Sequence, residues 1–246
     1  MDYKLIVSDV DGCLSPEESV GWNLSHFAEV AARVRGGGRN GAPLPVTLCT
    51  GRPQPYVEVL LKLFDISLPA ICENGAVIYD LPSNASRFGP GVTERLIGVI
   101  REIRSFVERE ILPIYHDVAI QFGKEAQLSI YSGEPEQIPP MADRVRSFAA
   151  RLGAGLVRVD ASHYYLNVSI ADVSKGSALA LVAKELGATR DRTAVIGDTS
   201  GDLPMRDHAA FFGAPANATD EIKAIADYVS PFPDLRGVAD ILDQIT

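Results

Sequence analysis

The 246-residue sequence has few cysteines, no excess of positive charge and no long hydrophobic run. Its three cysteines, Cys13, Cys49 and Cys72, lack the spacing of zinc ligands or of a redox dithiol, so we expect free thiols in a reducing compartment. The formal net charge of -9 disfavours a nucleic-acid partner, because proteins that bind phosphate backbones carry basic patches. Since no apolar run approaches membrane-spanning length, we expect no membrane partner.

The start of the sequence also lacks the features of a secretory signal. Residues 1–4 lead straight into the short apolar run Leu5-Ile6-Val7, without a basic flank and a long apolar core. We therefore expect a cytoplasmic protein. The composition that remains is ordinary for a globular chain, with 46% hydrophobic and 22% charged residues, and the length allows one large α/β domain or two small ones.

Short apolar runs alternate with helical patterns in the first and last parts of the chain. The runs at residues 5–7, 45–49 and 193–196 are each followed within a few residues by a helical pattern. A short apolar run bounded by polar residues is typical of a strand buried on both faces of a parallel sheet. The alternation therefore predicts βαβ units and a parallel sheet.

The middle of the chain has a different rhythm. Residues 81–91 are rich in Pro, Ser, Asn and Gly, which indicates a hinge or linker. Helical patterns at 94–110 and 141–152 then alternate with pairs of strand patterns at 118–122 and 127–131, and at 156–159 and 164–170. This order predicts a small sheet covered by helices on one face. We place this second domain at residues 84–172, inserted into a first domain formed by residues 1–83 and 173–246.

Two pairs of aspartates follow predicted strands. Asp9 and Asp11 come just after the first strand, with Gly12 permitting a sharp turn, and Asp198 and Asp202 follow a later apolar run. By itself the first pair fits a solvated turn. Four carboxylates at two strand ends repel one another unless a cation lies between them. Because the nearby residues offer oxygen ligands and neither His nor paired Cys, we expect Mg²⁺ and not zinc.

Two further segments offer contacts for a phosphate group. Thr50-Gly51-Arg52 follows the apolar run at 45–49 and supplies a hydroxyl and loop amides. Lys175 begins the helical pattern that restarts the first domain, where its ammonium can reach an anion or a carboxylate. Each signal is weak alone, since Thr50 also fits a helix cap and Lys175 a surface side chain.

Taken in order, these four segments resemble the four motifs of the haloacid dehalogenase superfamily, and the resemblance covers nearly the whole chain. Glu73-Asn74-Gly75-Ala76 and Asp202-Leu203-Pro204-Met205 look further like its Cof-type (subfamily IIB) sugar-phosphatase branch, whose members insert an α/β cap between the second and third motifs. The resemblance implies a Rossmann-like, doubly wound parallel sheet as the core, with an inserted α/β cap domain that sets substrate specificity.

The resemblance also implies a role for each residue. Asp9 is expected to attack phosphorus and form an aspartyl-phosphate, while Asp11 protonates the leaving oxygen and later activates water. Mg²⁺ is expected to be held by Asp9, the backbone carbonyl of Asp11 and Asp198, with Asp202 as a ligand or a neighbouring partner. The residues expected to hold the phosphate group or substrate are Gly12, Thr50, Gly51, Arg52, Asn74 and Lys175.

Two positions depart from the pattern of this branch. Cys13 stands where Thr is usual, and Gly201 stands where Asn often precedes the last Asp. We expect the first change to matter little, because the catalytic carboxylates come before it. The second removes a possible side-chain contact to phosphate or substrate, so it bears on the affinity or the class of substrate.

These residues predict a Mg²⁺-dependent phosphatase that acts on a small phosphate ester. The substrate is expected to be a sugar phosphate or a phosphorylated carboxylic acid such as phosphoglycolate or mannosyl-phosphoglycerate. A phosphomannomutase-like phosphosugar mutase is the nearest alternative, but Thr50-Gly51-Arg52 looks like the phosphatase form of the second motif. The alternative from another class is a non-catalytic metabolite-binding module, which the intact Asp9, Asp11 and Lys175 disfavour.

The inserted domain is where the sequence says least about function. Its candidates for substrate contact are His163, Tyr165 and Asn167, in addition to Arg52 and Asn74 of the first domain. For each of these, ordinary packing in a strand or at the surface is an equally good interpretation. The sequence carries no signal for an oligomeric state.

Overall fold

The computed structural model describes residues 3–16 and 20–246, and the chain divides into two compact units. One unit comprises Met1–Arg87 and Ser174–Thr246, and the other comprises Phe88–Val173. Residues 1 and 2, on which the expectation about the N-terminus partly rests, lie outside the described residues.

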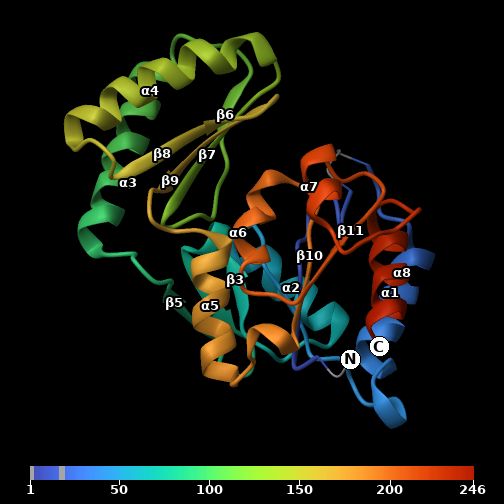
Figure 1. Ribbon diagram of the computed structural model, residues 1–246. Helices are drawn as coiled ribbons and strands as arrows, with labels where there is room; N and C mark the ends of the chain where they lie inside the picture. Colours follow the sequence, from blue (N-terminus) through green and yellow to red (C-terminus); the bar gives the residue numbers. More distant parts are fainter. Residues whose placement is uncertain (1–2, 17–19) are drawn as a thin grey trace. The chain divides into compact units, whose positions relative to one another are not determined.

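A five-stranded parallel sheet forms the centre of the first unit, with the strand order β12-β11-β10-β1-β2 (Figure 1). Ser8, the last residue of β1, is in register with Ile196 of β10 on one side and with Leu48 of β2 on the other. The chain therefore leaves three neighbouring strands at the same edge of the sheet. The strands are β1 (Leu5–Ser8), β2 (Val46–Leu48), β10 (Thr193–Ile196), β11 (Phe211–Ala214) and β12 (Tyr228–Val229).

Helices pack against both faces of this sheet. In β1, Ile6 belongs to one hydrophobic cluster and Leu5 and Val7 to another, as expected when successive side chains of a buried strand point to opposite faces. The cluster around Ile6 includes residues of α1 (Leu24–Gly36), α2 (Gln54–Phe64) and α8 (Asp234–Ile245). The other cluster includes residues of α5 (Lys175–Leu186), α6 (Leu203–Arg206) and α7 (Asp220–Ile225). The prediction of a doubly wound α/β core is confirmed.

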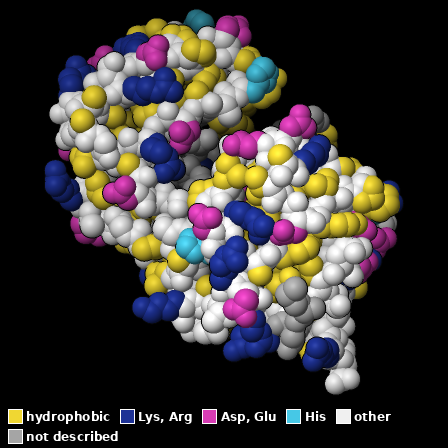
Figure 2. Space-filling view, in the orientation of Figure 1, with side chains coloured by type: hydrophobic (Ala, Val, Ile, Leu, Met, Phe, Trp, Pro, Cys, Tyr) yellow, Lys and Arg dark blue, Asp and Glu magenta, His cyan; other side chains and the backbone are white. Residues whose placement is uncertain are grey.

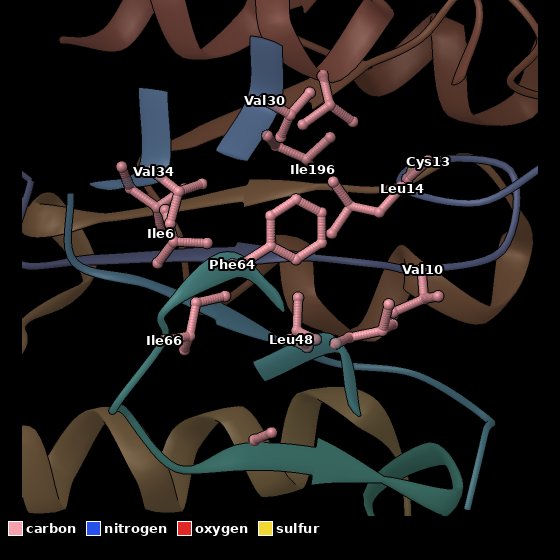
Figure 3. Packing of buried hydrophobic residues seen from close by; sticks show 14 of the residues in the cluster. Ile6, Val10, Cys13, Leu14, Val30, Val34, Leu48, Phe64, Ile66 and Ile196 are labelled. Carbon is pink, nitrogen blue, oxygen red and sulfur yellow. The ribbon is translucent and has the colours of Figure 1, made fainter. Parts of the chain in front are cut away.

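Phe64 lies within the cluster that surrounds Ile6. Figure 3 shows its ring among Ile6, Leu48 and Ile66, and the side chain is 0% exposed. Its ring centroid lies 4.5 Å from that of Phe27 on α1. Aromatic burial of this kind contributes a large apolar area to the core.

A separate three-stranded sheet in the first unit has the order β3-β4-β5. Its strands are β3 (Ala70–Cys72), β4 (Val77–Asp80) and β5 (Ala85–Phe88), and β3 pairs with β4 antiparallel. Strand β5 lies within residues 81–91, which the sequence indicated as a hinge or linker and where no strand was predicted. All four residues of β5 are exposed, so this strand has no buried face that would give its sequence an alternating pattern.

The second unit is a four-stranded antiparallel sheet with two helices on one of its faces (Figure 1). The strand order is β6-β7-β9-β8, with β6 (Val118–Ile120), β7 (Gln127–Ser132), β8 (Val157–Ala161) and β9 (Tyr165–Ile170). The helices are α3 (Glu94–Phe106), which continues as one π-helical turn, and α4 (Ile138–Leu152). This α/β unit, inserted between two segments of the first, confirms the predicted cap architecture.

Alternation along β7 and β9 separates an apolar from a polar face of this sheet. Leu128 is paired with Val168 and Ile130 with Leu166, and all four side chains are buried. The intervening pairs are polar: Gln127 with Ser169, Ser129 with Asn167, and Tyr131 with Tyr165. The apolar pairs supply the face on which helices pack.

The surface in view carries charges of both signs. Figure 2 shows Lys and Arg side chains interspersed with Asp and Glu over both parts of the molecule. Among the described residues, no helix is both long and apolar enough to cross a membrane.

The burial of Phe64 leads to a prediction about stability. Phe64→Ala should lower the free energy of unfolding by about 3–5 kcal/mol, because it leaves a cavity in the core. Leu63→Ala is the matched control, since the neighbouring Leu63 is 44% exposed on the same helix, and it should cost less than about 1 kcal/mol. Urea denaturation followed by circular dichroism measures both, and equal losses would contradict the assignment of Phe64 to the core.

Candidate functional site

The carboxyl ends of β1, β10 and β2 bring the predicted motifs together. Asp9 directly follows β1, and its backbone N–H donates to the carbonyl of Ile196 at 2.9 Å. Asp198 comes two residues after β10, and Thr50 comes two residues after β2. This edge is where ligand sites form in open parallel sheets. Segments that lie about 190 residues apart in the sequence thus meet because their strands are paired in parallel.

Three aspartates from these strand ends form one buried cluster. Asp9, Asp198 and Asp202 are 5%, 3% and 0% exposed, and each offers a carboxylate oxygen within 4.8 Å of the others. Lys175 lies among them, with its Nζ 2.8 Å from Oδ2 of Asp9 and 2.7 Å from Oδ1 of Asp202. Three carboxylates lie around one ammonium, so the group of four side chains is net negative when all are ionised and favours a further cation.

Burial controls the ionisation of this cluster. It raises the pKa of the Asp9 carboxyl to about 7, together with the charge of Asp202 and against the opposing effect of Lys175. Burial alone would lower the pKa of the Lys175 ammonium, but Asp202 and Asp9 hold it well above its usual range. Lys175 therefore stays charged, while Asp9 exchanges a proton near neutral pH.

Both carboxylate oxygens of Asp202 accept hydrogen bonds, two of them from its own loop and one from Lys175. Its Oδ2 accepts from the backbone N–H of Asp198 at 2.9 Å and of Thr199 at 3.1 Å, and its Oδ1 accepts from Lys175. These bonds fix the loop after β10 and point the Asp198 segment at the cluster. Asp202 thus orders the site in addition to contributing charge, which fits the expectation of a ligand or a neighbouring partner.

Gly12 fits closely against Asp198. Its φ of +74° is in the left-handed region, and a Cβ built on it would lie 2.0 Å from Oδ2 of Asp198. Only glycine combines this backbone conformation with this approach. Asn217 supports the same loop, because its Nδ2 donates to the carbonyl of Gly12 at 2.8 Å.

Asn217 is a site residue that the sequence did not suggest. Its Oδ1 also accepts from the backbone N–H of Asp234, so the amide joins the Gly12 loop to the start of α8. The available signal was its place three residues after β11, at the same sheet edge as the other motifs. That signal is weak, since a single Asn in a loop normally forms a turn.

The side chain of Asp11 is not part of the acidic cluster. It forms a bidentate ion pair with Arg52, whose Nε lies 3.0 and 2.9 Å from Oδ1 and Oδ2 and whose Nη2 lies 2.6 Å from Oδ1. The sequence indicated both residues but not their pairing. The predicted role of Asp11 in holding a metal involves its backbone carbonyl, which this ion pair leaves available.

The segment Thr50-Gly51-Arg52 is held by the turn Glu73–Gly75 between β3 and β4. Backbone N–H groups of Asn74 and Glu73 donate to the carbonyls of Thr50 at 3.0 Å and Arg52 at 3.1 Å. A Cβ on Gly51 would lie 3.1 Å from the Asn74 amide, so these two segments are in close contact. Thr50 itself is 0% exposed, and its hydroxyl accepts from the backbone N–H of Arg52.

The same turn also contacts the start of α5. Glu73 and Asn74 both have positive φ values, 50° and 55°. A Cβ on Gly75 would lie 2.2 Å from the carbonyl of Ser174, the N-cap of α5. The strained turn therefore fixes the Thr50 loop and the helix that carries Lys175 relative to each other.

The two departures from the family pattern have different surroundings. Cys13 is buried, with its Sγ 3.9 Å from Oδ1 of Asp198, and burial raises the pKa of its thiol well above the usual range. A Cβ on Gly201 would meet Thr199 Oγ1 at 3.6 Å, which is ordinary contact. Steric contacts therefore do not require a glycine at position 201.

The remaining candidates lie in the second unit. Tyr165 and Asn167 are on β9, where Asn167 accepts a hydrogen bond from the Ser129 hydroxyl, and His163 lies in the turn before β9 against the ring of Tyr164. The three are thus on or next to the polar face of the antiparallel sheet. None belongs to the acidic cluster formed by the described residues.

Comparisons with known proteins bear on the family and the fold of this chain. Residues 6–102 and 101–242 match the family of haloacid dehalogenase-like hydrolases. A phosphoglycolate phosphatase of Archaeoglobus fulgidus is 31% identical over 97% of this chain and 95% of its own. A haloacid dehalogenase-like hydrolase of Bacteroides thetaiotaomicron is structurally similar, with a TM-score of 0.74 and 20% identity over 99% of this chain and all (100%) of the other. A HAD/COF-like hydrolase of Plasmodium vivax has a TM-score of 0.73 and 18% identity over 99% and 95% of the two chains.

The contact between Gly12 and Asp198 leads to a prediction about metal binding. Gly12→Ala should weaken Mg²⁺ binding by about 10- to 100-fold, because the new methyl group displaces the Asp198 carboxylate. Gly21→Ala is the control, since no atom lies within 4 Å of a Cβ at that position. Isothermal titration calorimetry on the folded variants measures the dissociation constants, and an unchanged value for Gly12→Ala would remove Asp198 from the metal site.

Proposed function

This chain belongs to the haloacid dehalogenase-like hydrolase family, as its four motifs indicated, and we propose that it is a Mg²⁺-dependent phosphatase of small phosphate esters. The observation that carries the proposal is the buried cluster in which Lys175 contacts Asp9 at the end of β1. A buried carboxylate beside a fixed ammonium is suited to act on an anionic group that approaches it, because the ammonium attracts that group and offsets its repulsion by the carboxylate.

The donor set of the cluster fits Mg²⁺. Asp9, Asp198 and Asp202 offer carboxylate oxygens, and the backbone carbonyl of Asp11 is proposed as a further ligand. Mg²⁺ prefers hard oxygen ligands and usually binds through one or two carboxylates together with substrate phosphate. When bound, the ion would neutralise the acidic cluster and the charge of the phosphate group, which otherwise repel each other.

In the proposed reaction, a carboxylate oxygen of Asp9 attacks phosphorus. The bond from phosphorus to the leaving oxygen breaks, and that oxygen takes a proton from Asp11, which gives an aspartyl-phosphate and an alcohol. Water then attacks phosphorus and gives a proton to Asp11, which releases inorganic phosphate and restores Asp9. Lys175, Thr50 and the amides near Gly12, Gly51 and Asn74 are proposed to hold the phosphate oxygens during both steps.

The substrate is proposed to be phosphoglycolate or a similar small phosphorylated acid. Support comes from the Archaeoglobus fulgidus relative, which is named a phosphoglycolate phosphatase and is similar over nearly the full length of both chains. We further propose that the inserted unit sets substrate specificity. A cytoplasmic location and the lack of a nucleic-acid partner are proposed from the three buried thiols and the net charge of -9.

The role of Asp9 is tested by Asp9→Asn. Release of inorganic phosphate from phosphoglycolate with Mg²⁺ should fall by a factor on the order of 10⁴, because an amide is a poor nucleophile. Asp243→Asn, which changes an exposed carboxylate on α8, is the control and should retain full activity. An active Asp9→Asn protein, free of contaminating phosphatase, would contradict the mechanism.

The pKa of Asp9 predicts how Mg²⁺ binding depends on pH. Below about pH 7 the metal-free site holds a proton on Asp9, which Mg²⁺ must displace, so the affinity should fall by about tenfold for each pH unit below that value. Above it, the affinity should level off. Calorimetry in two buffers with different ionisation enthalpies counts the released proton, and Asp9→Asn should remove this pH dependence. A constant affinity across neutral pH in the unmodified protein would contradict the combination of a raised Asp9 pKa with Asp9 as a ligand.

A further inference from the structure

The ion pair between Asp11 and Arg52 is a carboxylate-binding site that the proposed mechanism leaves unexplained. The guanidinium donates to both oxygens of the Asp11 carboxylate at 2.6–3.0 Å, in the fork arrangement that Arg uses for carboxylates. The side chains of Arg52 and Asp11 are 34% and 28% exposed, so a small molecule can reach them from solvent.

Arg52 is held in a fixed position for this contact. Its guanidinium carbon lies 5.0 Å from the ring centroid of Tyr56 on α2, a cation–π distance. Its backbone N–H donates to the hydroxyl of Thr50, and its carbonyl accepts from Glu73. The guanidinium is therefore preorganised to donate hydrogen bonds to a planar anion next to the Thr50 loop.

This pairing conflicts with the role of Asp11 in the reaction. The proposed mechanism needs the Asp11 carboxyl at the leaving oxygen, whereas both of its oxygens accept hydrogen bonds from Arg52. Breaking this bidentate pair without a replacement would give up two or more charge-assisted hydrogen bonds. A second carboxylate that takes the place of Asp11 on Arg52 would remove this cost.

We propose, building on the phosphatase function, that Arg52 binds the carboxylate of a phosphorylated 2-hydroxy acid and that this carboxylate displaces Asp11 from Arg52. In such a substrate the carboxyl carbon is bonded to the carbon that carries the leaving oxygen. A substrate carboxylate bound to Arg52 therefore places the leaving oxygen close to the guanidinium from which Asp11 has been displaced. Recognition of the substrate then frees Asp11 to protonate the leaving oxygen.

The exchange predicts that a substrate lacking the carboxylate loses turnover as well as affinity. A neutral analogue leaves Asp11 paired with Arg52, so kcat should fall together with the rise in KM. A site that only binds the carboxylate more tightly would change KM and leave kcat the same.

The test compares phosphoglycolate with its neutral carboxamide, which has the same shape. We expect the unmodified enzyme to prefer the carboxylate by about 10- to 100-fold in kcat/KM, with part of the preference in kcat. Arg52→Met should remove the preference. Arg52→Lys keeps the positive charge but cannot donate two parallel hydrogen bonds to one carboxylate, and it should retain an intermediate preference. Tyr56→Leu keeps the guanidinium without its aromatic support and should weaken the preference less than Arg52→Met does.

Arg33→Met is the matched control. Arg33 forms a similar bidentate pair with Asp243 at 2.7 and 2.8 Å on the surface of the same unit, so its loss should leave the preference unchanged. Thermal denaturation confirms that the variants are folded. A preference that survives in Arg52→Met, or equal kcat values for both substrates in the unmodified enzyme, would overturn the exchange. Failure to hydrolyse either compound, or other phosphate esters with Mg²⁺, would instead overturn the proposed function.

Discussion

The contact of the Lys175 ammonium with two buried carboxylates is the interaction on which the candidate site depends. It joins Asp9 after β1 to Asp202 after β10, at 2.8 and 2.7 Å, in surroundings that exclude water. Removing one partner of a buried ion pair typically costs about 3–5 kcal/mol, because a charge is left uncompensated. Since Lys175 begins α5, the charge balance of the site also depends on where the chain re-enters the first unit after the insertion.

Steric fit holds the segments that we propose to bind phosphate around this charge cluster. The turn Glu73–Gly75 contacts both the Thr50 loop and the start of α5, so the hydroxyl of Thr50 and the ammonium of Lys175 share one support. Gly12 is close enough to Asp198 that no larger residue fits. Such supports are expected where a site must keep like charges close together before its ligands arrive.

Sequence patterns predicted the main parts of this protein because each part has a local cause. Buried strands need apolar runs, as in Leu5–Ser8. Ligand sites of open parallel sheets lie beyond the carboxyl ends of the strands, where the polar residues Asp9 and Asp198 stand. The four motifs in order identified the family, which the match over residues 6–242 confirms. The exposed strand β5 escaped this approach, because its sequence reflects backbone pairing and not a buried face.

The sequence by itself determined the family, the parallel core with an inserted α/β unit, and the list of carboxylates that could hold a metal. The tertiary structure alone decided which carboxylate has which partner. Asp9 and Asp11 are separated by one residue, yet one contacts buried Lys175 and the other partly exposed Arg52. The reason is that the chain turns just after β1, where the Val10 carbonyl accepts from the N–H groups of Cys13 and Ser15, so distant segments and the burial they create, not local spacing, set the charge and hydrogen bonds around each carboxylate.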